Sequence, residues 1–184
     1  MISIHQLLRK FYLALFNPDP IAVLIKHGLV VGRNFHVQED VVIDSSHCWH
    51  ITIGDDVTLA PRVHILAHDA STKMHLGYTR IGKVKIGNRV FIGASSTILP
   101  GVTIGNNVVI GAGSVVSRDV PDGVVAVGNP AKVVGSLDDF LARRKAEMTA
   151  VPLFDESYQL RHQPSADMKA AMNEKLGGGA GYII

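Results

Sequence analysis

The sequence is poor in the residues that fill an ordinary globular core, because aromatic side chains make up only 6% of its 184 residues. Its single cysteine, Cys48, cannot form an internal disulfide. No stretch approaches the roughly 20 apolar residues of a membrane-spanning helix, and the formal net charge of +2 predicts no nucleic-acid partner. Arg9 and Lys10 interrupt the first apolar run, which argues against a secretory signal. We therefore expect a cytoplasmic protein.

The dominant feature of the sequence is a six-residue repeat. From Ile86 to Val116 an aliphatic residue recurs at every sixth position, and the same phase continues upstream through Ile53, Leu59 and Ile65. A second inward position, four residues after these, is held by Val57, Val63, Val90, Ser96, Val102, Val108 and Ser114. In a helix or an ordinary strand, apolar residues would recur at shorter intervals. Three hexads of short strands and turns make one coil of 18 residues, so the sequence predicts an all-β solenoid, a parallel β-helix with aliphatic ladders inside.

Two interruptions break this repeat. Between Ile43 and Ile53 the extra residues fall in the segment 44–50, and between Ile65 and Ile86 about fifteen residues must leave the solenoid, at about residues 70–83. Segments that leave a regular scaffold often carry the function. We therefore expect the functional side chains near these two segments.

Helical patterns flank the repeat on both sides. An amphipathic stripe from Ile4 to Phe16 predicts a helix, and residues 1–28 are expected to cap the open end of the solenoid. The alternative is that this helix lies on the inner face of the membrane. Residues 29–135 would form the β-helix.

The C-terminal segment 136–184 is predicted as a helix and tail. Ser136 and Asp139 form a capping-box pattern for a helix from about Leu137 to Met148, which would cap the other end of the solenoid. A second helix is expected to start at Ser165 and to run to Leu176, before Gly177.

Residues 102–134, VTIGNNVVIGAGSVVSRDVPDGVVAVGNPAKVV, carry a family resemblance. The run resembles the C-terminal signature of the left-handed β-helix hexapeptide-repeat acyltransferases, in particular the branch of galactoside, maltose and surface-polysaccharide O-acetyltransferases. The resemblance covers roughly residues 30–134. It implies a left-handed β-helix, a homotrimer with active sites between subunits, acetyl-CoA as co-substrate and a carbohydrate acceptor, such as a bacterial surface polysaccharide or its precursor.

The proposed chemistry needs a base. Moving an acetyl group from a thioester to a hydroxyl requires a group that takes the hydroxyl proton and donors that hold the developing oxyanion. His68 lies where the chain leaves the solenoid, and it precedes the rung at Val84 by the sixteen residues that separate the family's catalytic histidine from its next rung. We expect His68 to be the base of a direct transfer, with His75 in the loop as the reserve candidate.

The resemblance also implies a site for the pantetheine arm of the cofactor. Phe91 stands where family members place a bulky aromatic residue beside this arm. Ala94 stands where the family uses a backbone N–H near the thioester carbonyl, and Ala112 where a larger side chain would fill the cleft.

Three further residues are expected near the CoA phosphates. Ser117 and Arg118 match a Thr-Lys pair of the family, and Lys132 matches a basic residue. Cationic side chains suit phosphate, although Arg and Lys differ in geometry. The alternative is that Arg118 and Lys132 are merely solvated.

Two residues are candidates for the acceptor site. Asp44 aligns with a family carboxylate beside the acceptor, and Trp49 could offer an indole face to a sugar ring. Trp49 could equally serve only to pack the segment 44–50 onto the solenoid.

Three other functions remain open. The same residues could serve an N-acetyltransferase of an amino-sugar nucleotide, and a non-enzymatic scaffold would bind no acetyl-CoA. A metal enzyme like the γ-class carbonic anhydrases would need three or four converging ligands. Several histidines lie between His47 and His75, but no second cluster follows Ile86. We therefore expect no metal.

Overall fold

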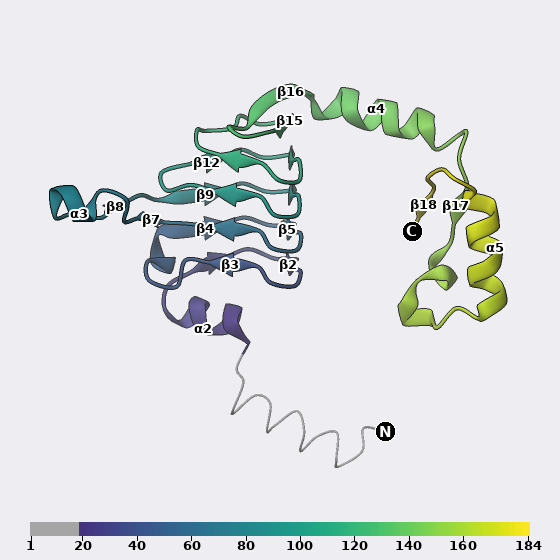
Figure 1. Ribbon diagram of the computed structural model, residues 1–184, viewed down its shortest axis with the longest axis horizontal. Helices are drawn as coiled ribbons and strands as arrows, with labels where there is room; N and C mark the ends of the chain where they lie inside the picture. The colour runs from purple at the N-terminus through teal and green to yellow at the C-terminus, as the bar shows by residue number, and fades with distance from the viewer. Residues whose placement is uncertain (1–18) are drawn as a thin grey trace, which may run out of the picture. The chain divides into compact units, whose positions relative to one another are not determined.

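The computed structural model describes residues 19–184, so the predicted helix from Ile4 to Phe16 lies outside the described chain. The chain divides into two compact units, one ending at Leu137 and the other running from Asp138 to Ile184 (Figure 1). The elements of the first unit are α2 (Pro20–Lys26), β1 (Val30–Val31), β2 (His36–Val37), β3 (Val42–Ile43), η1 (Cys48–His50), β4 (Ile51–Ile53), β5 (Thr58–Leu59), β6 (His64–Ile65), β7 (His68–Asp69), α3 (Lys73–Leu76), β8 (Arg80–Ile81), β9 (Val84–Ile86), β10 (Val90–Ile92), β11 (Thr97–Ile98), β12 (Thr103–Ile104), β13 (Val108–Ile110), β14 (Val115–Val116), β15 (Val124–Val127) and β16 (Lys132–Ser136). The helix α4 (Leu137–Glu147) starts at the boundary and is followed by β17 (Leu153–Phe154), η2 (Glu156–Tyr158), η3 (Leu160–His162), α5 (Ala166–Leu176) and β18 (Tyr182–Ile183).

Three parallel sheets make up the first unit. The first sheet has the order β1-β4-β9-β12 and the third has β3-β6-β11-β14. The second runs β2-β5-β10-β13-β15, and β16 is added antiparallel to its last strand. The chain visits the three sheets in turn, so three strands complete one coil. Ile86 pairs with Ile104 and Ile92 with Ile110, each 18 residues apart, which confirms the predicted coil of three hexads.

Three corners join the sheets within each coil. We call them the first corner (from the first sheet to the second), the second corner (from the second to the third) and the third corner (from the third to the first). The coils stack along one direction, so residues at equivalent positions of successive coils line up along each corner (Figure 1).

The interior of the stack is aliphatic. All six rung residues from Ile86 to Val116 are at most 3% exposed, and the seven predicted second inward positions are at most 2% exposed. Burial of an aliphatic side chain of this size stabilises a fold by about 1.5–3 kcal/mol. The two serines of the set are satisfied, since Ser96 Oγ and Ser114 Oγ both donate to the carbonyl of Gly111. The sequence pattern therefore predicted the core correctly.

The first corner needs both asparagine and glycine, for different reasons. Asn107 adopts a left-handed backbone with a φ of 54°. Gly105 is required because a Cβ there would lie 2.7 Å from the backbone nitrogen of Asp122 in the next coil. The short distance between stacked coils, and not a left-handed backbone conformation, therefore requires glycine at position 105.

The segment 70–83 projects from the third corner (Figure 1). Its base is a short antiparallel pair, with His68 opposite Ile81 and Asp69 opposite Arg80. Helix α3 lies at its tip. His68 therefore lies at the base of the projecting loop.

Helix α2 contacts the core cluster through Ile21 and Leu24. Cys48 Sγ lies 3.4 Å from the carbonyl of His27 and 3.6 Å from that of Leu24, which ties η1 to this helix. No residue of helix α4 is buried within the described chain. That α4 covers the other end of the coils stays a prediction.

The second unit contains the second predicted helix. Helix α5 begins after Ser165, whose hydroxyl accepts a bond from the Met168 N–H at 3.1 Å, and it ends at Gly177, as the capping residues predicted. Strands β17 and β18 pair in parallel, so the C-terminal residues contact their own unit. Among the described residues no helix is long and apolar enough to cross a membrane.

Candidate active site

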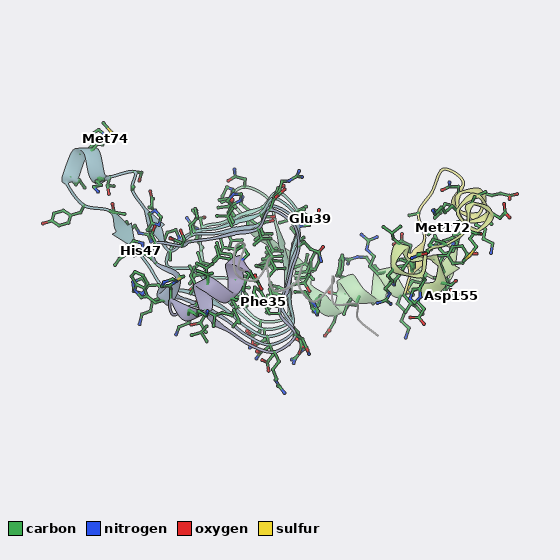
Figure 2. All side chains as sticks on the ribbon, turned by 90° about the horizontal axis from the view of Figure 1, so that it is seen from below. Phe35, Glu39, His47, Met74, Asp155 and Met172 are labelled. Atoms are coloured by element: carbon green, nitrogen blue, oxygen red, sulfur yellow. The ribbon has the colours of Figure 1, made fainter. Side chains whose placement is uncertain are left out.

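Both interruptions of the repeat meet at the third corner. Ile43 pairs with Ile65 of the next coil, and the Asp44 N–H donates to the carbonyl of Ile65 at 2.9 Å. Asp44 therefore lies directly beside the point where the chain turns toward His68. Figure 2 labels His47 near the base of the loop and Met74 at its tip.

The Asp44 carboxylate is the buried centre of this corner. One oxygen accepts from Nδ1 of His68 at 2.5 Å and from the Ala67 N–H at 2.9 Å. The other oxygen accepts from the backbone N–H groups of Ser46 and His47 at 3.0 and 3.1 Å. Burial by itself raises the pKa of Asp44, but the hydrogen bonds from His68 and from the Ala67 N–H outweigh it and hold the pKa below the ordinary value. The carboxylate is therefore ionised at neutral pH.

This carboxylate orients the imidazole of His68. The Asp44 side chain is fully buried, whereas 35% of the His68 side chain is exposed. Because Asp44 accepts at Nδ1, the proton of the neutral ring is assigned to Nδ1, and Nε2 keeps its lone pair. His68 thus combines a fixed tautomer with an exposed edge, which is what a general base requires.

The predicted contact between Asp44 and an acceptor stays a prediction. Both of its oxygens already accept two protein hydrogen bonds, and the side chain has no exposed surface. Its side-chain partner in the described chain is His68. The sequence contained a signal for this contact. Asp44 directly follows the rung residue Ile43, and Ile43 stacks on Ile65, which comes three residues before His68.

An aromatic surface adjoins His68. The ring centroids of His47 and His68 are 5.2 Å apart, and those of His47 and Trp49 are 5.3 Å apart. Trp49 is 55% exposed, while its Cβ packs where Gly28 has no side chain. The Trp49 side chain is therefore held at its Cβ, while more than half of the residue remains exposed. His75, the reserve candidate, lies exposed in α3.

The structure brings four of the predicted cofactor residues to one edge, near the second corner. Ala94 and Ala112 occupy equivalent corner positions of successive coils, and the Gly113 N–H donates to the Ala94 carbonyl at 2.8 Å. Phe91 lies three residues before this corner and is 45% exposed. Lys132 pairs with Val127, the last residue of β15, in the coil that follows the coil of Ala112. Its side chain is exposed.

The other two predicted cofactor residues lie elsewhere. Ser117 and Arg118 follow β14 at the third corner, on the same edge as His68, and both are exposed. One chain therefore holds the six residues on two separate edges of the stack.

The backbone N–H of Ala94 differs from those that link neighbouring coils. Pro61, which has no N–H, occupies the equivalent corner position in the preceding coil, since Leu59 pairs with Ile92. This position therefore contributes no N–H to the contacts between coils. The Ala94 N–H forms no hydrogen bond with another residue of the described chain.

Within residues 19–184, one group of side chains could hold a metal ion. Asp44, His47 and His68 each offer a ligand atom, and these atoms all lie within 4.8 Å of one another. The sequence does not reveal this set, because the convergence of Asp44, His47 and His68 depends on how the segment 44–50 folds against the next coil.

Residues 83–118 match the family described as "Bacterial transferase hexapeptide (six repeats)". The stacked hexads of the first unit fit this description. Fold and site together define the class: a transferase of the hexapeptide-repeat type.

Similarity to known proteins narrows the class. The chain is 49% identical over 120 residues to "Protein CapG" of Staphylococcus aureus, covering 62% of this chain and 70% of CapG. It is 39% identical to the solved structure of a galactoside acetyltransferase in complex with coenzyme A, with a TM-score of 0.54, covering 60% of this chain and 56% of that chain. A maltose O-acetyltransferase from Clostridium difficile 630 matches at 34% identity and a TM-score of 0.53, over 69% of this chain and 83% of that one. The chain belongs to the hexapeptide-repeat acetyltransferase family.

Proposed function

We propose that the protein transfers an acetyl group from acetyl-CoA to a hydroxyl of a carbohydrate, in the assembly of a bacterial surface polysaccharide or its precursor. The observation that carries this proposal is the buried Asp44 carboxylate that fixes the ring of the half-exposed His68. The similar proteins support the co-substrate and the acceptor class, since one is solved with coenzyme A and two are described as acting on a galactoside and on maltose.

His68 acts first as base and then as acid. Its Nε2 takes the proton of the sugar hydroxyl while Asp44 stabilises the resulting imidazolium. The hydroxyl oxygen attacks the thioester carbonyl, the tetrahedral oxyanion accepts a hydrogen bond from the Ala94 N–H, and the imidazolium returns the proton to the departing thiolate of CoA. The acetyl group passes directly to the acceptor, without a covalent acetyl-enzyme.

The mechanism needs more than one copy of the chain. His68 lies at the third corner and Ala94 at the second, with the third sheet between them. A neighbouring subunit can bring its second corner to the third corner of the first. A homotrimer would form three such clefts, each lined by His68 of one copy and by Ala94 of the next. Within this proposal the coils wind left-handed, as the family implies.

The exposed residues on the two edges suit CoA. Phe91 offers an exposed ring to the pantetheine arm, and the small side chain of Ala112 leaves room for it. Lys132 on one edge, and Ser117 with Arg118 on the other, would contact the phosphates. Their position on both sides of the third sheet supports a cofactor that lies between two subunits.

The aromatic surface beside His68 suits a sugar ring. The exposed indole of Trp49 can cover the apolar face of a pyranose, while a hydroxyl of the same sugar reaches Nε2. We place the reaction on the cytoplasmic side, with the segment 1–28 as the part that would contact the inner face of the membrane if the acceptor is membrane-linked.

The decisive experiment removes the base. His68→Ala should lower turnover by roughly 100- to 10,000-fold, measured as free thiol released from acetyl-CoA with galactosides, maltosides and oligosaccharides as acceptors. His64→Ala is the matched control, because His64 lies in the same coil with its ring bonded to the Arg62 carbonyl. Parental turnover of His68→Ala would contradict the mechanism. A preference for amine acceptors would favour N-acetylation, and no CoA binding in calorimetry would favour a scaffold.

A further inference from the structure

The imidazole of His47 holds a buried polar atom that the proposed mechanism does not use. Its Nδ1 has almost no exposed surface and no hydrogen-bond partner within the described chain. A buried nitrogen left unpaired costs free energy, and in a native structure it calls for a missing partner. Asp44 and His68 adjoin this ring, and each of the three residues offers one ligand atom within 4.8 Å of those of the other two.

The chemistry of these three groups points to a transition metal. Two imidazoles and one carboxylate with an open position form the donor set of many tetrahedral zinc sites. The hydrogen bonds from Ser46, His47 and Ala67 fix the carboxylate, as outer-shell donors do at metal sites.

We propose that Asp44, His47 and His68 bind a divalent transition-metal ion, with Zn²⁺ as the reference ion, and that the bound ion switches the transferase off. The second part of this proposal, that the ion inhibits the enzyme, rests on the proposed function. The Asp44 oxygen and Nδ1 of His68, now 2.5 Å apart, would move to about the 3.3 Å that two ligands of one tetrahedral zinc require. The shift is small and falls at the corner from which the loop projects.

Metal binding would change the tautomer of His68. When Nδ1 binds the ion, the proton of the neutral ring moves through solvent to Nε2, and no net proton is released. Nε2 then carries a hydrogen and has no lone pair for the acceptor hydroxyl. The same imidazole is thus a base without metal and an inactive ligand with it.

The test measures binding without reference to activity. The full-length protein, stripped of metal with a chelator, is titrated with Co²⁺ and followed by visible absorption, and with Zn²⁺ in calorimetry and thermal unfolding. One ion per chain, a tetrahedral Co²⁺ spectrum and a higher Tm with Zn²⁺ are expected. His47→Phe keeps a ring against Trp49 but removes both nitrogens, and it should weaken Zn²⁺ binding by at least about 100-fold.

The control is His50→Phe. His50 stacks on His47 with ring centroids 6.2 Å apart but does not belong to the ligand set, so its variant should bind Zn²⁺ like the parent. No Co²⁺ spectrum in the parent, or equal Zn²⁺ affinity in His47→Phe and the parent, would overturn the metal site. Zn²⁺ should inhibit acetyl transfer by the parent and not by His47→Phe at the same concentration. Full activity of the Zn²⁺-loaded parent would overturn the switch, whereas absence of transfer by the metal-free parent with every acceptor would instead remove the proposed function and leave the metal site standing.

Discussion

The carboxylate of Asp44 lies 2.5 Å from Nδ1 of His68, although 24 residues separate them in the chain. The contact exists because Ile43 and Ile65 pair between neighbouring coils and so place the two interruptions of the repeat at one corner. It gives the imidazole a fixed tautomer and an ionised partner, and the predictions for catalysis and acid stability depend on it.

Asp44→Asn should lower kcat by roughly 100- to 10,000-fold and leave the KM for acetyl-CoA nearly unchanged. An amide nitrogen that faces Nδ1 would donate to the ring, so the proton moves to Nε2 and the base is lost. Steady-state assays of thiol release measure this. The control is Asp69→Asn, which changes a carboxylate next to His68 that bonds the Ser71 N–H. Equal losses in both variants would argue against a specific role for Asp44.

The stability of the protein should depend on pH through Asp44. Its pKa in the folded state lies below the unfolded value near 3.8, so the ionised form favours folding. This contribution is fully present above the unfolded value and is lost as the pH falls through the folded value. Urea unfolding of the parent should therefore show a steeper loss of stability in this acid range than Asp44→Asn. Parallel curves for the two proteins would contradict the assignment.

Trp49→Ala should raise the KM for the acceptor about three- to tenfold, since a ring contact contributes about 0.5–1.5 kcal/mol. The KM for acetyl-CoA and the Tm should change little, because more than half of the side chain is exposed. Trp49→Phe should retain most of the affinity. A large drop in Tm with an unchanged acceptor KM would mean that Trp49 only packs the segment 44–50.

Ala112→Trp should weaken acetyl-CoA binding, measured by calorimetry, because an indole would occupy the edge along which the pantetheine arm is placed. Ala112 is exposed, so the fold should tolerate the change with about 0.5 kcal/mol or less of lost stability. Ala112→Ser adds only a hydroxyl and serves as the control. Parental affinity in the tryptophan variant would move the cofactor away from this edge.

Gly105→Ala should destabilise the first unit by about 1–3 kcal/mol, because the new Cβ would meet the backbone of Asp122. Gly135→Ala is the control, since its added Cβ would meet nothing within 4 Å. Urea denaturation of both variants measures the difference. Similar unfolding midpoints would show that the coils can move apart at this corner.

The sequence alone determined the coil and the position of His68, the proposed base, beside an interruption of the repeat. Rungs such as Ile86 and Ile104 repeat at fixed intervals because every coil buries the same positions, so the pattern can be read without coordinates. His68 could be found because the repeat fails beside it. Ser165 and Gly177 marked the ends of α5 because capping depends only on neighbouring residues.

Only the tertiary structure decided what surrounds that base. The role of Asp44 and the unpaired nitrogen of His47 depend on how the segment 44–50 folds against the next coil, and its irregular length hides that register from any periodic pattern. The distribution of the six predicted cofactor residues over two edges likewise follows from the corner that each one occupies. A local pattern fixes which side chains face inward, whereas contacts between coils fix which side chains meet, and those contacts form only when the chain has stacked on itself.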